Sequence, residues 1–150
     1  MTDDATMTDI AERLARLEDR DALHQLFVDY GRHLDNGDWD GYASLYAEDG
    51  EMALGPHLSA TGRANIRELM AERLSPLVGT YFHIIGSPEV AIDGDSATSK
   101  VQWVAIGVAP EGGPTMTSMG EHHDELVKAD GRWYIKRRVG RLSVAPAPRR

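Results

Sequence analysis

Three residues suited to proton transfer stand at separate points of this 150-residue chain, namely Tyr30, Asp35 and His83. The histidine lies in a short apolar run at 81–85, and the other two close a helix-like stretch upstream. An imidazole titrates near neutral pH, and a neighbouring carboxylate can fix its tautomer and raise its basicity. A phenol donates a hydrogen bond to an oxygen on which negative charge develops. If the fold brings the three side chains into one pocket, they form a proton-transfer site that needs no cofactor.

Each of these residues also has a purely structural explanation. His83 could be a core residue whose ring is satisfied by a backbone carbonyl. Asp35 could be a solvated residue at the end of its helix, but the helix dipole disfavours a carboxylate there, and a histidine partner would justify it. Tyr30 shares a helix face with Leu23, Leu26 and Phe27, so it is at least partly a core residue.

Composition narrows the functional classes. Twenty-four acidic residues against 16 Lys and Arg give a formal net charge of −8, which argues against nucleic-acid binding. No apolar run has the length of a membrane span, and the acidic start of the chain does not resemble a secretory signal. The absence of cysteine rules out disulfides and Cys-ligated metals. We expect a cytoplasmic protein with neither a membrane nor a nucleic-acid partner.

Apolar spacing predicts helices in the first half of the chain. The first covers about residues 8–34, where Ile10, Leu14 and Leu17 are continued by apolar residues from Leu23 onward, and the acidic segment at 18–21 could break it in two. Asn36-Gly37 ends this helix, and Asp38 caps a short second one. A short strand at 51–54 and a third helix at 62–74 follow.

The second half of the chain has the pattern of strands separated by turn signals. The predicted strands are 80–85, 89–92, 96–109, 115–128 and 132–144, and residues from 145 onward resemble a frayed tail. Helices followed by strands predict an α+β fold, in which about three helices pack on a curved antiparallel or mixed sheet. We expect a single domain with its core at about 8–144 and a pocket in the concave face.

The apolar composition of one predicted strand indicates that the protein associates with a second subunit. Residues 101–108 are apolar at nearly every position, which predicts that both faces of this strand are covered, one by the helices and the other by a second subunit. We therefore expect a homodimer or a higher homo-oligomer.

Short motifs in a fixed order make the chain resemble SnoaL-like domains of the nuclear-transport-factor-2-like superfamily. They are the segments 34–39, 46–50, 90–97, 120–126 and 130–138, with His83 between the second and the third. The resemblance spans about residues 10–142 and implies a cone-shaped α+β barrel. This fold carries dehydratases, isomerases, hydrolases, cyclases and non-catalytic binders, so it does not define one function.

The pattern is closest to scytalone dehydratases and bile-acid dehydratases, and that resemblance implies roles for individual residues. His83 matches the catalytic histidine, Asp35 its carboxylate partner and Tyr30 the tyrosine of the first helix. Bile-acid dehydratases also use an arginine on the last strand, for which Arg141 is the nearest match, although its spacing from Trp133 is one residue off. The resemblance also places His122 where the family usually has an aromatic residue, before the Asp of the final strand pair, and this departure could add a second acid or base.

These assignments predict a cofactor-independent lyase that dehydrates a cyclic or aromatic small molecule, or removes a small aldehyde from it by retro-aldol cleavage. We expect four residues to contact the substrate: Trp103, His122, Tyr46 and Arg141. Isomerisation in the same pocket and a non-catalytic binding or scaffold domain are the alternatives. We expect no metal, and a site combining His83, His122 and Asp35 is the one metal arrangement left open.

Overall fold

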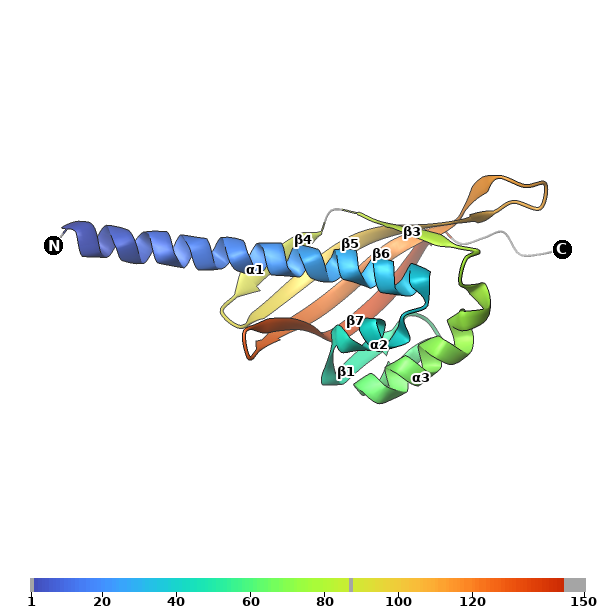
Figure 1. Ribbon diagram of the computed structural model, residues 1–150, viewed down its shortest axis with the longest axis horizontal. Helices are drawn as coiled ribbons and strands as arrows, with labels where there is room; N and C mark the ends of the chain where they lie inside the picture. The colour runs from blue at the N-terminus through green and yellow to red at the C-terminus, as the bar shows by residue number, and fades with distance from the viewer. Residues whose placement is uncertain (1, 87, 145–150) are drawn as a thin grey trace.

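The computed structural model of the protein describes residues 2–86 and 88–144, with side chains at 5–86 and 88–143 (Figure 1). The tail predicted from residue 145 onward lies outside the described residues. The helices are α1 (Thr2–Asn36), α2 (Trp39–Ser44), α3 (Arg63–Leu74) and the 3₁₀ helix η1 (Ser75–Leu77). The strands are β1 (Tyr46–Ala53), β2 (Ser59–Thr61), β3 (Phe82–Ile85), β4 (Glu89–Asp93), β5 (Ser96–Val108), β6 (Pro114–Ala129) and β7 (Arg132–Val144).

The strands form one mixed sheet in the order β2-β1-β7-β6-β5-β3, with β4 also paired to β5. β1 runs parallel to β7, and the other pairs are antiparallel. Register shifts interrupt β5–β6 and, twice, β6–β7, and such bulges bend and twist long strands. The helices lie across the concave side of the bent sheet (Figure 1), so the predicted α+β fold is confirmed.

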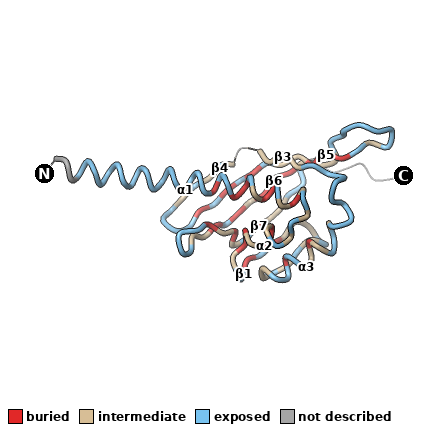
Figure 2. The backbone as a smooth tube through the Cα atoms, in the orientation of Figure 1, coloured by how far each residue is buried: buried red, intermediate tan, exposed pale blue. Residues whose placement is uncertain are grey.

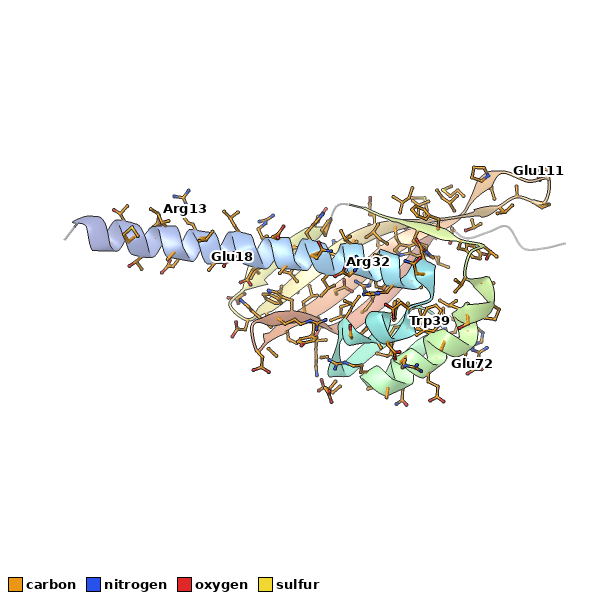
Figure 3. All side chains as sticks on the ribbon, viewed as in Figure 1. Arg13, Glu18, Arg32, Trp39, Glu72 and Glu111 are labelled. Carbon is orange, nitrogen blue, oxygen red and sulfur yellow. The ribbon has the colours of Figure 1, made fainter. Side chains whose placement is uncertain are left out.

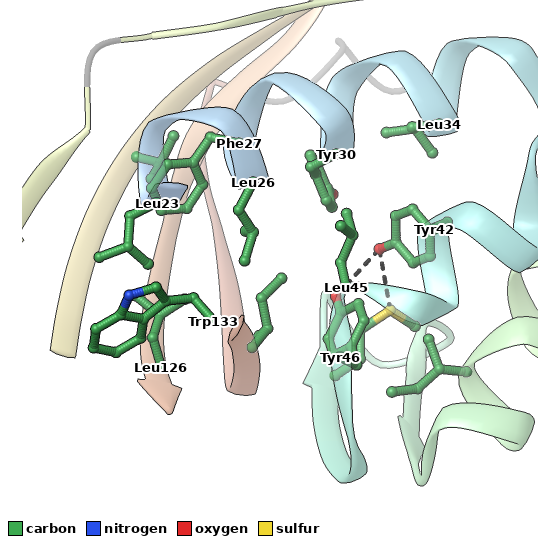
Figure 4. Packing of buried hydrophobic residues seen from close by; sticks show 14 of the residues in the cluster. Leu23, Leu26, Phe27, Tyr30, Leu34, Tyr42, Leu45, Tyr46, Leu126 and Trp133 are labelled. Atoms are coloured by element: carbon green, nitrogen blue, oxygen red, sulfur yellow. Dashed lines mark hydrogen bonds between the residues drawn. The ribbon is translucent and has the colours of Figure 1, made fainter. Parts of the chain in front are cut away.

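The second half of α1 provides the helical side of the core. Leu23, Leu26, Phe27, Tyr30 and Leu34 are buried on the side that faces the sheet (Figure 4). Leu126, Trp133 and Ile135 meet them from β6 and β7. This packing fixes the position of the C-terminal turn of α1 over the concave side, which is where Asp35 stands.

Two details of the predicted elements are wrong. The break expected at 18–21 does not occur, since α1 is continuous, and Asp19 instead accepts hydrogen bonds from Trp133 Nε1 (2.9 Å) and Lys128 Nζ (2.7 Å). The acidic segment thus ties the helix to the β6–β7 hairpin. The strand predicted at 51–54 begins earlier, at Tyr46, and the short strand β2 was not predicted.

The predicted continuous apolar stripe along α1 is also wrong. Leu14 and Leu23 are nine residues apart, which is two and a half turns of a helix with 3.6 residues per turn, so they lie on opposite sides. Residues 5–18 are all exposed, and this part of α1 extends beyond the sheet (Figure 2). None of the described helices is long and apolar enough to cross a membrane.

Candidate active site

The structure brings Asp35 and His83 into direct contact, although 48 residues separate them in the chain. His83 Nδ1 lies 2.6 Å from Asp35 Oδ1, and the backbone N–H of His83 donates to both carboxylate oxygens at 3.1 and 3.0 Å. These bonds stabilise a carboxylate at the C-terminal turn of α1, where the helix dipole alone disfavours it. The ring contact also selects a tautomer, because a carboxylate accepts the Nδ1 proton and leaves Nε2 with a lone pair. The contacts with Asp35 therefore fix the orientation of the His83 ring.

The pair opens on a cavity of about 370 Å³, within the usual range for small-molecule sites. The wall is mainly apolar, with a few polar groups that converge from α1, β3, β5, β6 and β7. The apolar residues that line it include Leu34, Leu54, Leu58, Met70, Leu74, Leu77, Val78, Ile85 and Leu142. The polar and aromatic ones are Tyr30, Asp35, Tyr81, His83, Trp103, Thr117, Ser118, His122 and Arg141.

Tyr30 lines the cavity from α1 and is almost fully buried, at 3% exposure. Burial raises the pKa of its hydroxyl above the ordinary value, against the opposing effect of the Arg138 charge, so the side chain stays a neutral phenol. The Arg138 guanidinium lies 4.2 Å from the centre of the Tyr30 ring. Tyr30 thus retains a proton that it can donate.

His122 lines the same cavity from β6, with its ring 5.3 Å from that of Tyr30 and 5.7 Å from that of Trp103. Burial lowers the pKa of His122 well below 6.5, and the charge of Arg138 acts in the same direction. A neutral imidazole carries one N–H donor and one lone pair. His122 can therefore serve as a second neutral donor or acceptor beside Tyr30.

Under these rings lies a buried ion pair that sequence reasoning missed. Arg138 and Asp124 have no exposed side-chain surface, and the guanidinium binds the carboxylate through two contacts of 2.7 Å. Ser99 Oγ donates to Asp124 Oδ2 at 3.0 Å. Neither member of the pair lines the cavity. The pair holds the floor of the site together and places a positive charge beneath Tyr30 and His122.

Of the other three residues predicted to contact substrate, two line the cavity and one does not. Trp103 lines the cavity wall, and its buried Nε1 has no hydrogen-bond partner among the described residues. Arg141 is exposed at the cavity edge, so it is not the buried arginine of the last strand, which is Arg138. Tyr46 is fully buried, with its hydroxyl 3.3 Å from that of Tyr42, and does not line the cavity. The geometry therefore gives Tyr46 a packing role and no substrate contact.

The described part of the chain contains no group of three His, Asp or Glu side chains arranged to hold a metal ion. His83, His122 and Asp35, the combination left open by the sequence, do not form such a group.

A curved mixed sheet with a helix across it and a His–Asp pair opening on an internal cavity defines a class of small α+β domains built to enclose a ligand. The chain belongs to the SnoaL-like domain family, whose sequence model matches residues 15–139. No curated protein matches the sequence significantly.

Solved structures agree on the fold. A nuclear-transport-factor-2-like protein with a cystatin-like fold from Novosphingobium aromaticivorans is 29% identical, with a TM-score of 0.84 over 91% of this chain and 89% of that one. A candidate scytalone dehydratase from the same organism is 23% identical, with a TM-score of 0.73 over 91% and 97%. A type 2 hexachlorocyclohexane dehydrochlorinase is 19% identical, with a TM-score of 0.76 over 91% and 97%. The last two likenesses establish the shared fold alone.

Proposed function

We propose that the protein is a cofactor-independent lyase of the dehydratase type, acting on a cyclic or aromatic small molecule. The observation that carries the proposal is the 2.6 Å contact between Asp35 and His83 at the wall of a mainly apolar cavity. An oriented imidazole base and neutral donors in a mainly apolar cavity are parts that an elimination needs. Two of the structural neighbours named above, the candidate dehydratase and the dehydrochlorinase, also carry names of eliminating enzymes.

In the proposed reaction, His83 Nε2 removes a proton from the carbon next to an electron-withdrawing group. The electron pair of that C–H bond forms the new double bond, and the bond to the neighbouring hydroxyl breaks. Tyr30 or His122 donates a proton to the leaving oxygen, which departs as water. His83 then gives up the proton it removed, and the donor takes one back, so that both residues return to their starting states. Each positioned acid or base contributes a factor of about 10² to 10⁴ in rate, enough for an activated substrate.

The cavity favours a flat and mostly apolar substrate. Its volume of about 370 Å³ suits one or two rings, and Trp103 offers an aromatic wall for stacking. The rings of Tyr30 and His122 lie 5.3 Å apart in the cavity wall that His83 also lines, so we place the reacting hydroxyl and carbonyl beside these three residues. Arg141 at the cavity edge would contact a polar substituent that reaches solvent.

The same residues could begin a retro-aldol loss of a small aldehyde or an isomerisation, because both also need a base and an oxygen-stabilising donor. A second class of function, a non-catalytic ligand binder or scaffold, would use the cavity for binding alone. The orientation of His83 by Asp35 favours catalysis, since a binder has no need of an imidazole with a fixed tautomer.

The test is to incubate the purified protein with a panel of hydroxylated cyclic ketones and aromatic compounds and to follow loss of water or aldehyde by mass spectrometry. His83→Ala should lower kcat at least a hundredfold, and Asp35→Asn should lower it with a smaller change in KM. His57→Ala, at an exposed residue outside the cavity, is the matched control. Ligand binding without turnover, unchanged by His83→Ala, would establish the binding alternative instead.

We also propose a homodimer through the outer face of the sheet. Register places Phe82 and Ile84 of β3 beside Ile106 and Val104 of β5 on the face away from the helices. Phe82 is 59% exposed and Ile84 is 49% exposed, and contiguous apolar surface of this kind marks contact sites. A cytoplasmic location stays a prediction from the sequence.

A further inference from the structure

The exposed first half of α1 carries a strip of apolar side chains with a defined spacing. Met7, Ile10, Leu14 and Leu17 are each about half exposed or more, and they follow one another at intervals of three, four and three residues. This is the spacing of the a and d positions of a heptad repeat, the seam along which two helices form a coiled coil. Residues between them are polar or alanine.

The side chains of the strip cannot pack in the core of their own domain. It lies on the side of α1 opposite to Leu23 and the other residues that pack on the sheet, as the half-turn offset between Leu14 and Leu23 requires. Val28, which lies further along the same side, is also exposed, at 46%. A helical segment of this length that packs on nothing is marginal in water, because most helix stability in proteins comes from burying an apolar face. The strip therefore indicates a partner.

Charges beside the strip identify the partner as a second copy in parallel orientation. With Met7 and Leu14 at a positions, Arg13 is a g residue and Glu18 is the e residue of the next heptad (Figure 3). In a parallel pair these positions meet across the interface, so Arg13 of each helix faces Glu18 of the other. An antiparallel pair with the same four apolar layers would place Arg13 against Arg13. The 3.6 Å contact of Arg13 with Asp9 is an exposed ion pair within the helix, which contributes little to stability. Arg13 can leave Asp9 and pair with Glu18 of the other helix instead.

We propose that residues 7–17 form a short parallel coiled coil with the same segment of a second chain. The arrangement leaves room for the two domains, since each sheet lies on the outer side of its own helix. The next a position is Asp21, where two carboxylates would meet, so the apolar seam ends before the helix docks on the sheet. This contact is separate from the outer face of the sheet, because residues 7–17 belong to the part of α1 that extends beyond the sheet (Figure 1).

Cross-linking tests the contact directly, because the chain has no cysteine of its own. Leu14→Cys puts a thiol in the seam, and Glu12→Cys puts one on the opposite side of the same exposed helix. Under mild oxidation at micromolar protein, Leu14→Cys should form covalent dimers at least tenfold faster than Glu12→Cys. Equal rates for the two variants would overturn the proposal. In a mixture of Ile10→Cys and Leu14→Cys chains, preferential linkage between unlike chains would overturn the parallel orientation.

Sedimentation equilibrium provides the second measurement. Ile10→Glu/Leu14→Glu places charges in the seam while keeping residues that favour helix, so the domain itself should still fold. We expect the molar mass of the assembly to fall by a factor of two relative to the unmodified protein. Ala5→Glu/Ala15→Glu adds the same charge outside the strip and should leave the mass unchanged. An unchanged mass for the seam variant would refute the coiled coil.

Discussion

The neutral state of buried His122 predicts a specific dependence of stability on pH. Only 5% of this residue is exposed, and burial is the main cause that lowers its pKa well below 6.5. The charge of Arg138 lowers the pKa of His122 further. In the unfolded chain the same side chain regains an ordinary histidine pKa of about 6.5. The unfolded state therefore binds a proton at a pH where the folded state does not.

The sign and size of the effect follow from linkage. Above about pH 6.5 the imidazole is neutral in both states, and the full stability is present. As the pH falls below that value, protonation of the unfolded chain lowers the free energy of unfolding, by about 1.4 kcal/mol at pH 5.5 and about 2 kcal/mol at pH 5.0. The loss continues until the pH reaches the lowered pKa of His122 in the folded state.

The measurement is urea denaturation at several pH values between 7.5 and 5.0, for the unmodified protein and for His122→Phe. Phenylalanine keeps a ring beside Tyr30 and Trp103 but cannot bind a proton. The unmodified protein should lose about 1.4 kcal/mol more than the variant on going from pH 7.5 to 5.5. His57→Phe, at an exposed histidine outside the cavity, is the control for replacing a histidine by phenylalanine. If the free energy of unfolding of His122→Phe falls with pH as steeply as that of the unmodified protein, the buried neutral imidazole is refuted.

Two further predictions concern the buried ion pair and the outer face of the sheet. Asp124→Leu should lower the free energy of unfolding by about 3–5 kcal/mol, since it leaves the Arg138 charge buried without its partner, and Asp124→Leu/Arg138→Met should restore most of that loss in urea denaturation. Ile84→Lys should weaken self-association in sedimentation, because it charges the exposed apolar surface beside Val104, whereas Ala64→Lys at an exposed position of α3, away from that face, should not. Equal masses for the two lysine variants would contradict an interface on that face.

The sequence allowed the site pair to be predicted because two independent signals agreed. The helix dipole makes Asp35 an unfavourable residue unless a partner stabilises it, and the order of motifs matched a family with a His–Asp pair. Neither signal gives the distance between Asp35 and His83, because that distance depends on how α1 crosses β3. The three hydrogen-bonding contacts from His83 to Asp35 give the partner that the dipole argument required.

The sequence alone could not show that Arg138 is the buried arginine of β7, because a β-bulge determines which residues of that strand face inward. Alternation along β7 puts Trp133 and Ile135 on the inner face, so unbroken pairing would put Arg137 there next. The register shift between Glu125 and Leu126 moves the pairing by one residue, and Arg138 faces Asp124 instead. After the same shift, Arg141 points away from the interior. Bulges leave little trace in local propensity, so strand periodicity alone could not reveal this one.

The charges around the cavity restrict the chemistry further. Among the residues that line it, the groups with a formal charge are Asp35, which is engaged by His83, and Arg141 at the edge. Arg138 is bound to Asp124 and does not line the cavity, and Tyr30 and His122 are neutral. Negative charge that develops on a substrate oxygen in the interior would therefore meet neutral donors, and hydrogen bonds from neutral donors are roughly half as strong as charge-assisted ones. The substrate must supply the rest of the stabilisation itself, by delocalising the charge through a conjugated carbonyl or an aromatic ring. If the proposed elimination is correct, a simple alcohol should bind without reacting, and a β-hydroxy ketone fused to a ring should react.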